Sequence, residues 1–258
     1  MSRIREAFAN GKAFIPFITC GDPDLATTAA CVRAMAEAGA NLIELGIPFS
    51  DPTAEGPVIQ SANARALSGG VTTDKIFDMV AELRKDVTVP MVFMTYANVV
   101  FSYGMERFLE RAQAVGMDGI ILPDVPFEEK EEFAPACRAH GIDMISLIAP
   151  TSEGRVSEIA KAAEGFVYCV SSLGVTGVRS QITTDIGAMI KLVKEANPDI
   201  PCAVGFGIST PEQAAKMAGL SDGAIVGSAI VKLIAQYGRD AVPHVREYVR
   251  GMAAAVHG

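Results

Sequence analysis

The sequence lacks the clustered positive charge that a nucleic-acid-binding protein needs. It has 22 Lys and Arg residues against 30 Asp and Glu residues in 258, a net charge of −8. Phosphate backbones are bound by clusters of Lys and Arg, and the sequence contains no such cluster. Its charges are spread along the chain, so it has no acidic or basic tail either. We therefore expect no nucleic-acid partner.

Paired cysteines and long hydrophobic runs are also missing. Five cysteines, an odd number without a CxxC motif and mostly in apolar stretches, are typical of buried thiols in a cytoplasmic protein. No run reaches the roughly 18 apolar residues of a membrane span. Arg3, Arg5 and Glu6 carry charge where a signal peptide needs an apolar region. We therefore expect a cytoplasmic protein without membrane contact.

The common metal and nucleotide motifs are absent too. His140, His244 and His257 do not have the spacing of metal ligands, and no HExxH, GxSxG or P-loop occurs. Gly205 and Gly207 follow a predicted strand, but the third glycine of a dinucleotide-binding loop is missing. The sequence therefore indicates neither a metal ion nor a nucleotide cofactor.

What the sequence does contain is a regular alternation of short apolar runs and longer amphipathic stretches. The predicted strands are 14–19, 41–45, 91–95, 119–122, 144–148, 166–170, 202–205 and 224–226. The predicted helices are 25–38, 57–67, 73–85, 105–115, 128–140, 153–163, 185–196, 211–217, 229–237 and 242–255.

Eight such strand–helix units predict an α/β fold, the (β/α)8 TIM barrel, as one domain over residues 1–258. Strands that are apolar on both faces are typical of a covered parallel sheet. Extra helical turns at 3–9 are expected to close the barrel bottom, with additional helices after strands two and eight. A doubly wound open sheet is the competing fold, but it usually has fewer strands.

Carboxylates mark the expected mouth of this barrel, where the carboxyl ends of the strands meet. Glu44 lies inside an apolar strand, where burial raises the pKa of a carboxyl and suits it to general acid–base work. Asp51 and Glu55 follow in a loop with three prolines. Two carboxylates at one mouth fit acid–base chemistry, although a strand-end Glu that reaches solvent and an ordinary solvated loop would also fit the pattern.

Glycines follow each of the last three predicted strands, in the segments 171–177, 205–209 and 227–228. Backbone N–H groups at a helix N-terminus bind anions, and TIM barrels often hold a phosphate beside strands seven and eight. The sequence therefore predicts a phosphate-ester substrate.

Several segments resemble the tryptophan synthase α subunit family along almost the entire chain. They are PFITCGDP (16–23), ELGIPFSDP (44–52), YANVVF (96–101), PDVP (123–126), YCVS (168–171), GVTG (174–177), VGFGIS (204–209) and GSAIV (227–231). The resemblance implies a lyase that splits indole-3-glycerol phosphate into indole and glyceraldehyde 3-phosphate by a cofactor-free retro-aldol cleavage.

The resemblance also assigns roles to individual residues. Glu44 would move protons at indole C3 and at the adjacent hydroxyl, and Glu55 would accept a hydrogen bond from the indole N–H. Substrate binding is implied for Phe17, Tyr96, Leu122, Tyr168, Thr176 and Phe206. Phosphate binding is implied for Gly177, Gly207, Ile208, Gly227 and Ser228. Thr176 would lie in a lid at about 174–183 that closes on Glu55.

Glu55 departs from the family pattern, which has Asp at this position, and Thr53 replaces a larger apolar residue. An error of about 1 Å in position can cost roughly a hundredfold in rate. We predict that Glu55 keeps its role with reduced activity and that Glu55→Asp raises cleavage. A lower rate would mean that the loop is tuned for Glu.

The resemblance implies a partner as well. This is the tryptophan synthase β subunit, which holds pyridoxal phosphate, in an αββα heterotetramer contacted through Pro48, Asp51, Asn98 and Phe101. Two alternatives remain: a stand-alone lyase, and a weakly active α subunit that serves mainly as an allosteric activator of β. Indoleglycerol-phosphate synthase is disfavoured, because it expects a Lys at a strand end and no predicted strand has one.

Overall fold

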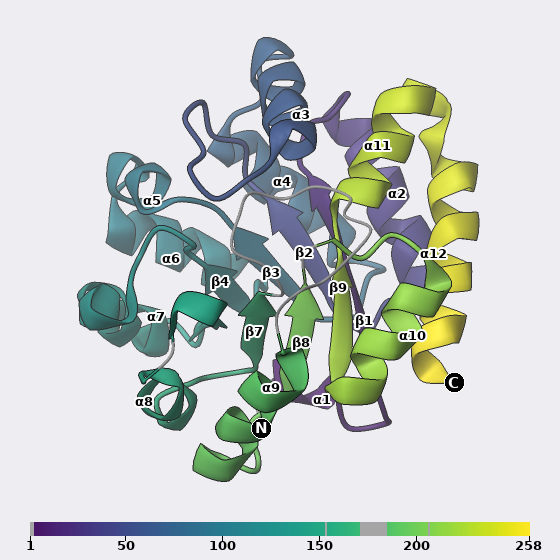
Figure 1. Cartoon of the computed structure of the whole chain (residues 1–258). Coiled ribbons are helices and arrows are strands. Elements are labelled where there is room, and N and C mark those ends of the chain that lie inside the picture. Colours follow the sequence, from purple (N-terminus) through teal and green to yellow (C-terminus); the bar gives the residue numbers. More distant parts are fainter. Residues whose placement is uncertain (1–2, 153, 171–184, 206) are drawn as a thin grey trace.

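The short apolar runs form the parallel strands of a barrel, and the amphipathic stretches form helices around it (Figure 1). The computed structural model describes residues 3–152, 154–170, 185–205 and 207–258. Within these ranges the strands are β1 (Ala13–Thr19), β2 (Ile43–Gly46), β3 (Met91–Met94), β4 (Gly119–Ile121), β5 (Asp143–Met144), β6 (Ser146–Ile148), β7 (Val167–Val170), β8 (Cys202–Gly205) and β9 (Gly223–Val226).

The α-helices of the described ranges are α1 (Arg3–Glu6), α2 (Leu25–Glu37), α3 (Pro57–Ser68), α4 (Thr73–Leu83), α5 (Ala97–Tyr103), α6 (Met105–Ala114), α7 (Ala134–Ala139), α8 (Val156–Lys161), α9 (Ile186–Ala196), α10 (Pro211–Leu220), α11 (Ser228–Tyr237) and α12 (Ala241–His257). Three short 3-10 helices complete this part of the chain: η1 (Phe127–Glu132), η2 (Pro150–Ser152) and η3 (Gly238–Asp240).

The sheet closes into a barrel through a bend at Ile145. The strand order is β5-β4-β3-β2-β1-β9-β8-β7-β6, and only Ile145 separates β5 from β6 in sequence. β5 pairs with β4, whereas β6 pairs with β7. The predicted TIM barrel is confirmed. The prediction of one strand over 144–148 is wrong, because this segment bends to pair with a different neighbour on each side.

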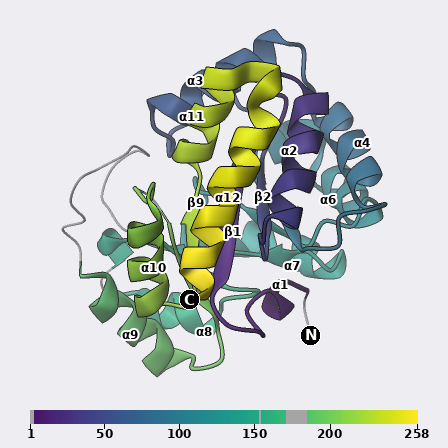
Figure 2. The same ribbon diagram turned by 90° about the vertical axis from the view of Figure 1, so that its right-hand side faces the viewer.

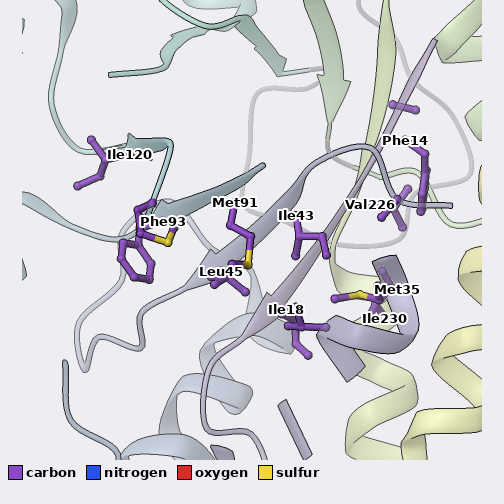
Figure 3. Packing of buried hydrophobic residues seen from close by; sticks show 14 of the residues in the cluster. Phe14, Ile18, Met35, Ile43, Leu45, Met91, Phe93, Ile120, Val226 and Ile230 are labelled. Carbon is purple, nitrogen blue, oxygen red and sulfur yellow. The ribbon is translucent and has the colours of Figure 1, made fainter. Parts of the chain in front are cut away.

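Alternation along the strands separates an inner from an outer apolar group. The inner group includes Ile15, Phe17, Val92, Ile121 and Ile225. The outer group includes Phe14, Ile18, Ile43, Leu45, Phe93 and Val226, which pack with Met35 of α2 and Ile230 of α11 (Figure 3). Ile4 of α1 is fully buried within the inner group, beside the first residue of β4. The first helical turns therefore close the barrel bottom, as predicted.

Some helices differ from their predictions. The stretch 128–140 divides into η1 and α7 at Phe133, because Pro135 cannot continue a helix without losing a hydrogen bond and clashing with the preceding turn. Helix α5 was not predicted, and α8 covers only part of 153–163. The extra helices after β2 (α3 and α4) and after β9 (α11 and α12) are confirmed. Figure 2 shows α12 lying across α2, α10 and α11.

Candidate active site

Glu44 lies on the inner face of the barrel wall. Leu42 belongs to the inner apolar group, and Ile43 and Leu45 belong to the outer one, so strand alternation directs Glu44 inward. Its side chain is only 1% exposed, and its Oε1 has no hydrogen-bond partner among the described residues. Burial raises the pKa of Glu44 to about 8. At pH 7 this carboxyl is therefore protonated in roughly nine molecules of ten.

Two aromatic side chains lie near Glu44. Phe17 of β1 is its neighbour in the strand register and is buried. A Cβ atom on Gly46, at the end of β2, would lie 2.6 Å from Cζ of Phe17, so the ring occupies space that only glycine leaves free. Tyr168 of β7 is also buried, and the Glu44 carboxylate contributes to raising the pKa of its phenol, after burial itself. Both rings belong to the inner apolar group, toward which the Glu44 side chain points.

Glu55 lies in the loop between β2 and α3 and is only 6% exposed. Nδ2 of Asn63 donates to its Oε2 at 3.4 Å, and the Tyr96 hydroxyl also donates to its carboxylate. The same hydroxyl accepts the N–H of Ala54 at 3.0 Å and so fixes the loop. Burial raises the pKa of Glu55 to about 7, the two hydrogen bonds oppose this rise, and the charge of Asp124 adds to it.

The predicted phosphate-binding residues Gly227 and Ser228 lie at the start of α11. Gly227 is the N-cap of this helix, and no side chain caps its first turn. The start of α10 is instead closed by a capping box between Thr210 and Gln213. The backbone N–H groups of the first turn of α11 are therefore not capped by a side chain, and such groups can bind anions. Gly207 has a φ of +79°, a backbone conformation that favours glycine.

The remaining predicted site residues are placed as follows. Ile208 is buried within the outer apolar group. Thr176, Gly177, Phe206 and the predicted lid lie outside the described residues. Leu122 follows β4 and also belongs to the outer apolar group. It lines a side cavity that also touches η1 and α8.

Three of the four predicted partner contacts are exposed. Phe101 and Asn98 lie on α5, where the Phe101 side chain is 51% exposed, and Asp51 lies in the loop before α3. Pro48 is buried. The ring of Phe49 in this loop lies 5.1 Å from that of Tyr96, so the loop and α5 are adjacent. The exposed contacts therefore lie on the loop that carries Glu55 and on the helix next to it.

Two residues that sequence reasoning missed organise this region. Asn63, in α3, supports Glu55 from two helical turns away. Asp124 accepts the N–H of Ala97 with both carboxylate oxygens at 3.1 Å and so caps α5. A lone Asn in an alanine-rich helix was the available signal for the first, and the PDVP segment was the signal for the second.

The described ranges contain neither a metal-binding cluster nor a membrane-spanning helix. No group of three or more His, Cys, Asp or Glu side chains there is arranged to hold a metal ion. No helix in those ranges is long and apolar enough to cross a membrane.

Comparisons with known proteins agree with one another. The family model for the tryptophan synthase alpha chain matches residues 4–257. The tryptophan synthase alpha chain of Lacticaseibacillus casei is 46% identical over 256 residues, which cover 99% of this chain and 96% of that protein. The one of Geobacter sulfurreducens is 49% identical over 243 residues, 92% of each chain.

Solved structures give the same result. A chain of Mycobacterium tuberculosis tryptophan synthase matches with a TM-score of 0.90 and 35% identity, covering 100% of this chain and 99% of that one. Tryptophan synthase subunit alpha from Legionella pneumophila matches with a TM-score of 0.88 and 33% identity, covering 99% and 98% of the two chains.

Proposed function

This chain belongs to the tryptophan synthase alpha chain family, and from that premise we propose that Glu44 and Glu55 carry out its chemistry. The chain is the alpha subunit, a lyase of tryptophan biosynthesis that cleaves indole-3-glycerol phosphate to indole and glyceraldehyde 3-phosphate. One observation carries the proposed roles. Glu44 is a buried carboxyl with a pKa of about 8, and one of its oxygens has no described partner.

The cleavage needs an acid and a base in turn. Protonation of indole C3 makes the ring an electron sink for the carbon–carbon bond that breaks. A base then removes the proton of the hydroxyl beside that bond, so the bond's electrons return to the indole and an aldehyde forms. Glu44 starts protonated, gives its proton to C3 and recovers one from the hydroxyl, which returns it to its first state.

Glu55 stabilises the charge that develops in this reaction. As C3 takes a proton, positive charge grows on the indole nitrogen, and a carboxylate that accepts the N–H bond lowers the energy of that state. Tyr96 and Asn63 hold the carboxylate in place. The prediction that Glu55→Asp raises cleavage stays a prediction.

The other predicted residues would bind the rest of the substrate. The uncapped start of α11 supports phosphate binding by Gly227 and Ser228, together with Gly177, Gly207 and Ile208. Phe17, Tyr96, Leu122, Tyr168, Thr176 and Phe206 would contact the indole and glycerol parts. Acid–base cleavage of this kind requires no cofactor in this chain.

Membership of the family implies a β-subunit partner. An αββα heterotetramer, with pyridoxal phosphate in the β subunit, is the proposed assembly, and exposed Phe101 supports a contact through α5. The five cysteines are free and buried, which fits the reducing cytoplasm as the proposed location.

The test is indole release from indole-3-glycerol phosphate, by the chain alone and then with a β subunit and serine. We expect slow release alone and strong stimulation by β, whereas fast release alone would favour a stand-alone lyase. Glu44→Gln should lower kcat by about 10²–10⁴-fold with little change in KM. Glu110→Gln, at an exposed position of α6, is the control. A Glu44→Gln enzyme with near-normal kcat would disprove the assignment.

A further inference from the structure

A cavity of about 230 Å³ lies at an edge of the barrel wall, beside the bend at Ile145. No strand pairing joins β4 to β6 in the described sheet, since β4 pairs with β5 and β6 pairs with β7. Successive residues of this segment, from Met144 to Leu147, all line the cavity. In a continuous strand, successive side chains point to opposite faces of the sheet, so only every second residue could line one cavity. Because four successive residues line this one, the cavity lies where the strand bends and the barrel wall is interrupted.

Lys130 of η1 gives this cavity a buried positive charge. The residue is only 5% exposed, and its Nζ donates to Oγ of Ser146 at 3.2 Å and to the carbonyl oxygen of Ala162 at 3.0 Å. An ammonium group has three protons, so one remains beyond these two bonds. No carboxylate in the described ranges lies within ion-pair distance of this nitrogen. Burial lowers the pKa of Lys130, although the charge of Glu164 partly opposes this.

The other polar groups of the cavity are also suited to an anion. Arg155 lies at its rim and pairs with Glu128, which is not part of the lining, at 2.6 Å. Ser146, Thr151 and Ser152 also line the cavity, and no Asp or Glu lines it. Much of the remaining lining is apolar and includes Val125, Phe127, Leu147 and Ile159. The walls therefore combine the unpaired Lys130 ammonium, an arginine already paired with Glu128, three hydroxyl-bearing residues and an apolar surface.

We propose that this cavity binds a small carboxylate with an apolar body about the size of a phenyl ring. Its carboxylate would accept hydrogen bonds from Lys130 and Ser146 and supply the counter-charge that the buried ammonium lacks. The volume suffices, because an apolar cavity of about 150 Å³ takes up benzene. A free amino acid fits less well, since its ammonium group would meet Lys130 and no acid. The site shares only Leu122 with the proposed substrate-binding residues and does not depend on them.

The test is a titration of the full chain with benzoate, benzyl alcohol and L-phenylalanine by calorimetry, with glycerol 3-phosphate present to fill the phosphate site. Benzoate should bind at least about tenfold more tightly than either of the others, because only its carboxylate can accept hydrogen bonds from the charged ammonium without bringing a second cation. Amide shifts in NMR spectra should gather at Lys130, Ser146 and Leu147. Shifts confined to Gly227 and Ser228 would place benzoate in the phosphate site and overturn the proposal, as would a failure to bind.

Matched variants test the role of the ammonium group. Lys130→Met removes the ammonium group and keeps an unbranched side chain that is one atom shorter. It should weaken benzoate binding at least about tenfold and leave benzyl alcohol nearly unchanged. Lys161→Met, at an exposed lysine of α8, should change neither. If Lys130→Met does not fold, benzoate binding is measured on Thr151→Trp instead. An indole ring at this exposed position of the cavity lining should fill the cavity and abolish binding. Unchanged benzoate affinity in the folded Lys130→Met or Thr151→Trp variant contradicts the proposal.

Discussion

Replacing Glu44 by glutamine should stabilise the protein, and the gain should grow with pH. The pKa of Glu44 rises from 4.5 to about 8 on folding because the carboxyl is buried. The folded state therefore holds this proton more tightly than the unfolded state does. The stability that this group contributes is complete below pH 4.5 and is lost as the pH rises through 8. Glutamine has nearly the same shape and does not ionise, so the free energy of unfolding of Glu44→Gln should not fall with pH for this reason.

The size of the gain follows from linkage. Each pKa unit corresponds to 1.36 kcal/mol, so the variant should exceed the parent by about 3 kcal/mol at pH 7 and about 5 kcal/mol at pH 9. At pH 4.5 the two should differ by less than about 0.5 kcal/mol. Urea unfolding followed by circular dichroism at the three pH values measures these differences. Glu110→Gln, at an exposed position, is the control and should show no such trend.

A pH-independent gain, or a loss of stability at pH 9, would refute this reasoning. Either result would mean that the Glu44 carboxyl is solvated or paired in the folded protein. Such a result would also remove the physical basis for the proposed role of Glu44 as a proton donor near neutral pH. The same variant should lose activity, so stability and catalysis are expected to change in opposite directions at this residue.

Other predictions concern different parts of the molecule. Arg84→Met should cost about 3 kcal/mol in urea unfolding. The buried Asp118 loses the closer of its two ion pairs, at 2.5 Å, and keeps only Arg3 at 3.3 Å, while three backbone carbonyls lose the Arg84 donor. A cost below about 1 kcal/mol would contradict this. Gly46→Ala should lower kcat/KM for cleavage at least roughly tenfold by displacing the Phe17 ring, whereas Gly219→Ala, in open space on α10, should not. The proposed single domain predicts coincident thermal transitions in far-UV circular dichroism and tyrosine absorbance, and two separate transitions would disprove it.

Much of the barrel could be predicted because its strands are apolar on both faces. The predicted strand 202–205 coincides with β8 (Cys202–Gly205). The break at Ile145 could not be predicted, because the stretch 144–148 reads as one apolar run and only its pairing with two different neighbours divides it. Helix α5 was missed for a related reason, since its capping residue, Asp124, lies 27 residues further along the chain.

In the site, too, residues marked by a local sequence pattern could be predicted, whereas contacts between distant segments could not. Glu44 could be singled out from the sequence because a carboxylate is conspicuous within an apolar strand. The contacts of Glu55 with Asn63 and Tyr96 depend on how the loop before α3, α3 itself and the end of β3 pack together. No local sequence pattern predicts this packing. Lys130 lies in a glutamate-rich stretch typical of a solvated surface, yet η1 turns it inward to Ser146.

The pairing of β1 with β9 has a consequence for the synthesis of the chain. Ala13 to Pro16 of the first strand pair with Gly223 to Val226 of the last. At about 5–20 residues per second, the ribosome needs roughly 10–40 s to make the intervening 200 or so residues. Throughout that time one edge of β1, a strand buried along its whole length in the finished barrel, has no partner. Unpaired strand edges attract other chains, so the nascent chain is exposed to aggregation at this edge until β9 has been made and pairs with β1.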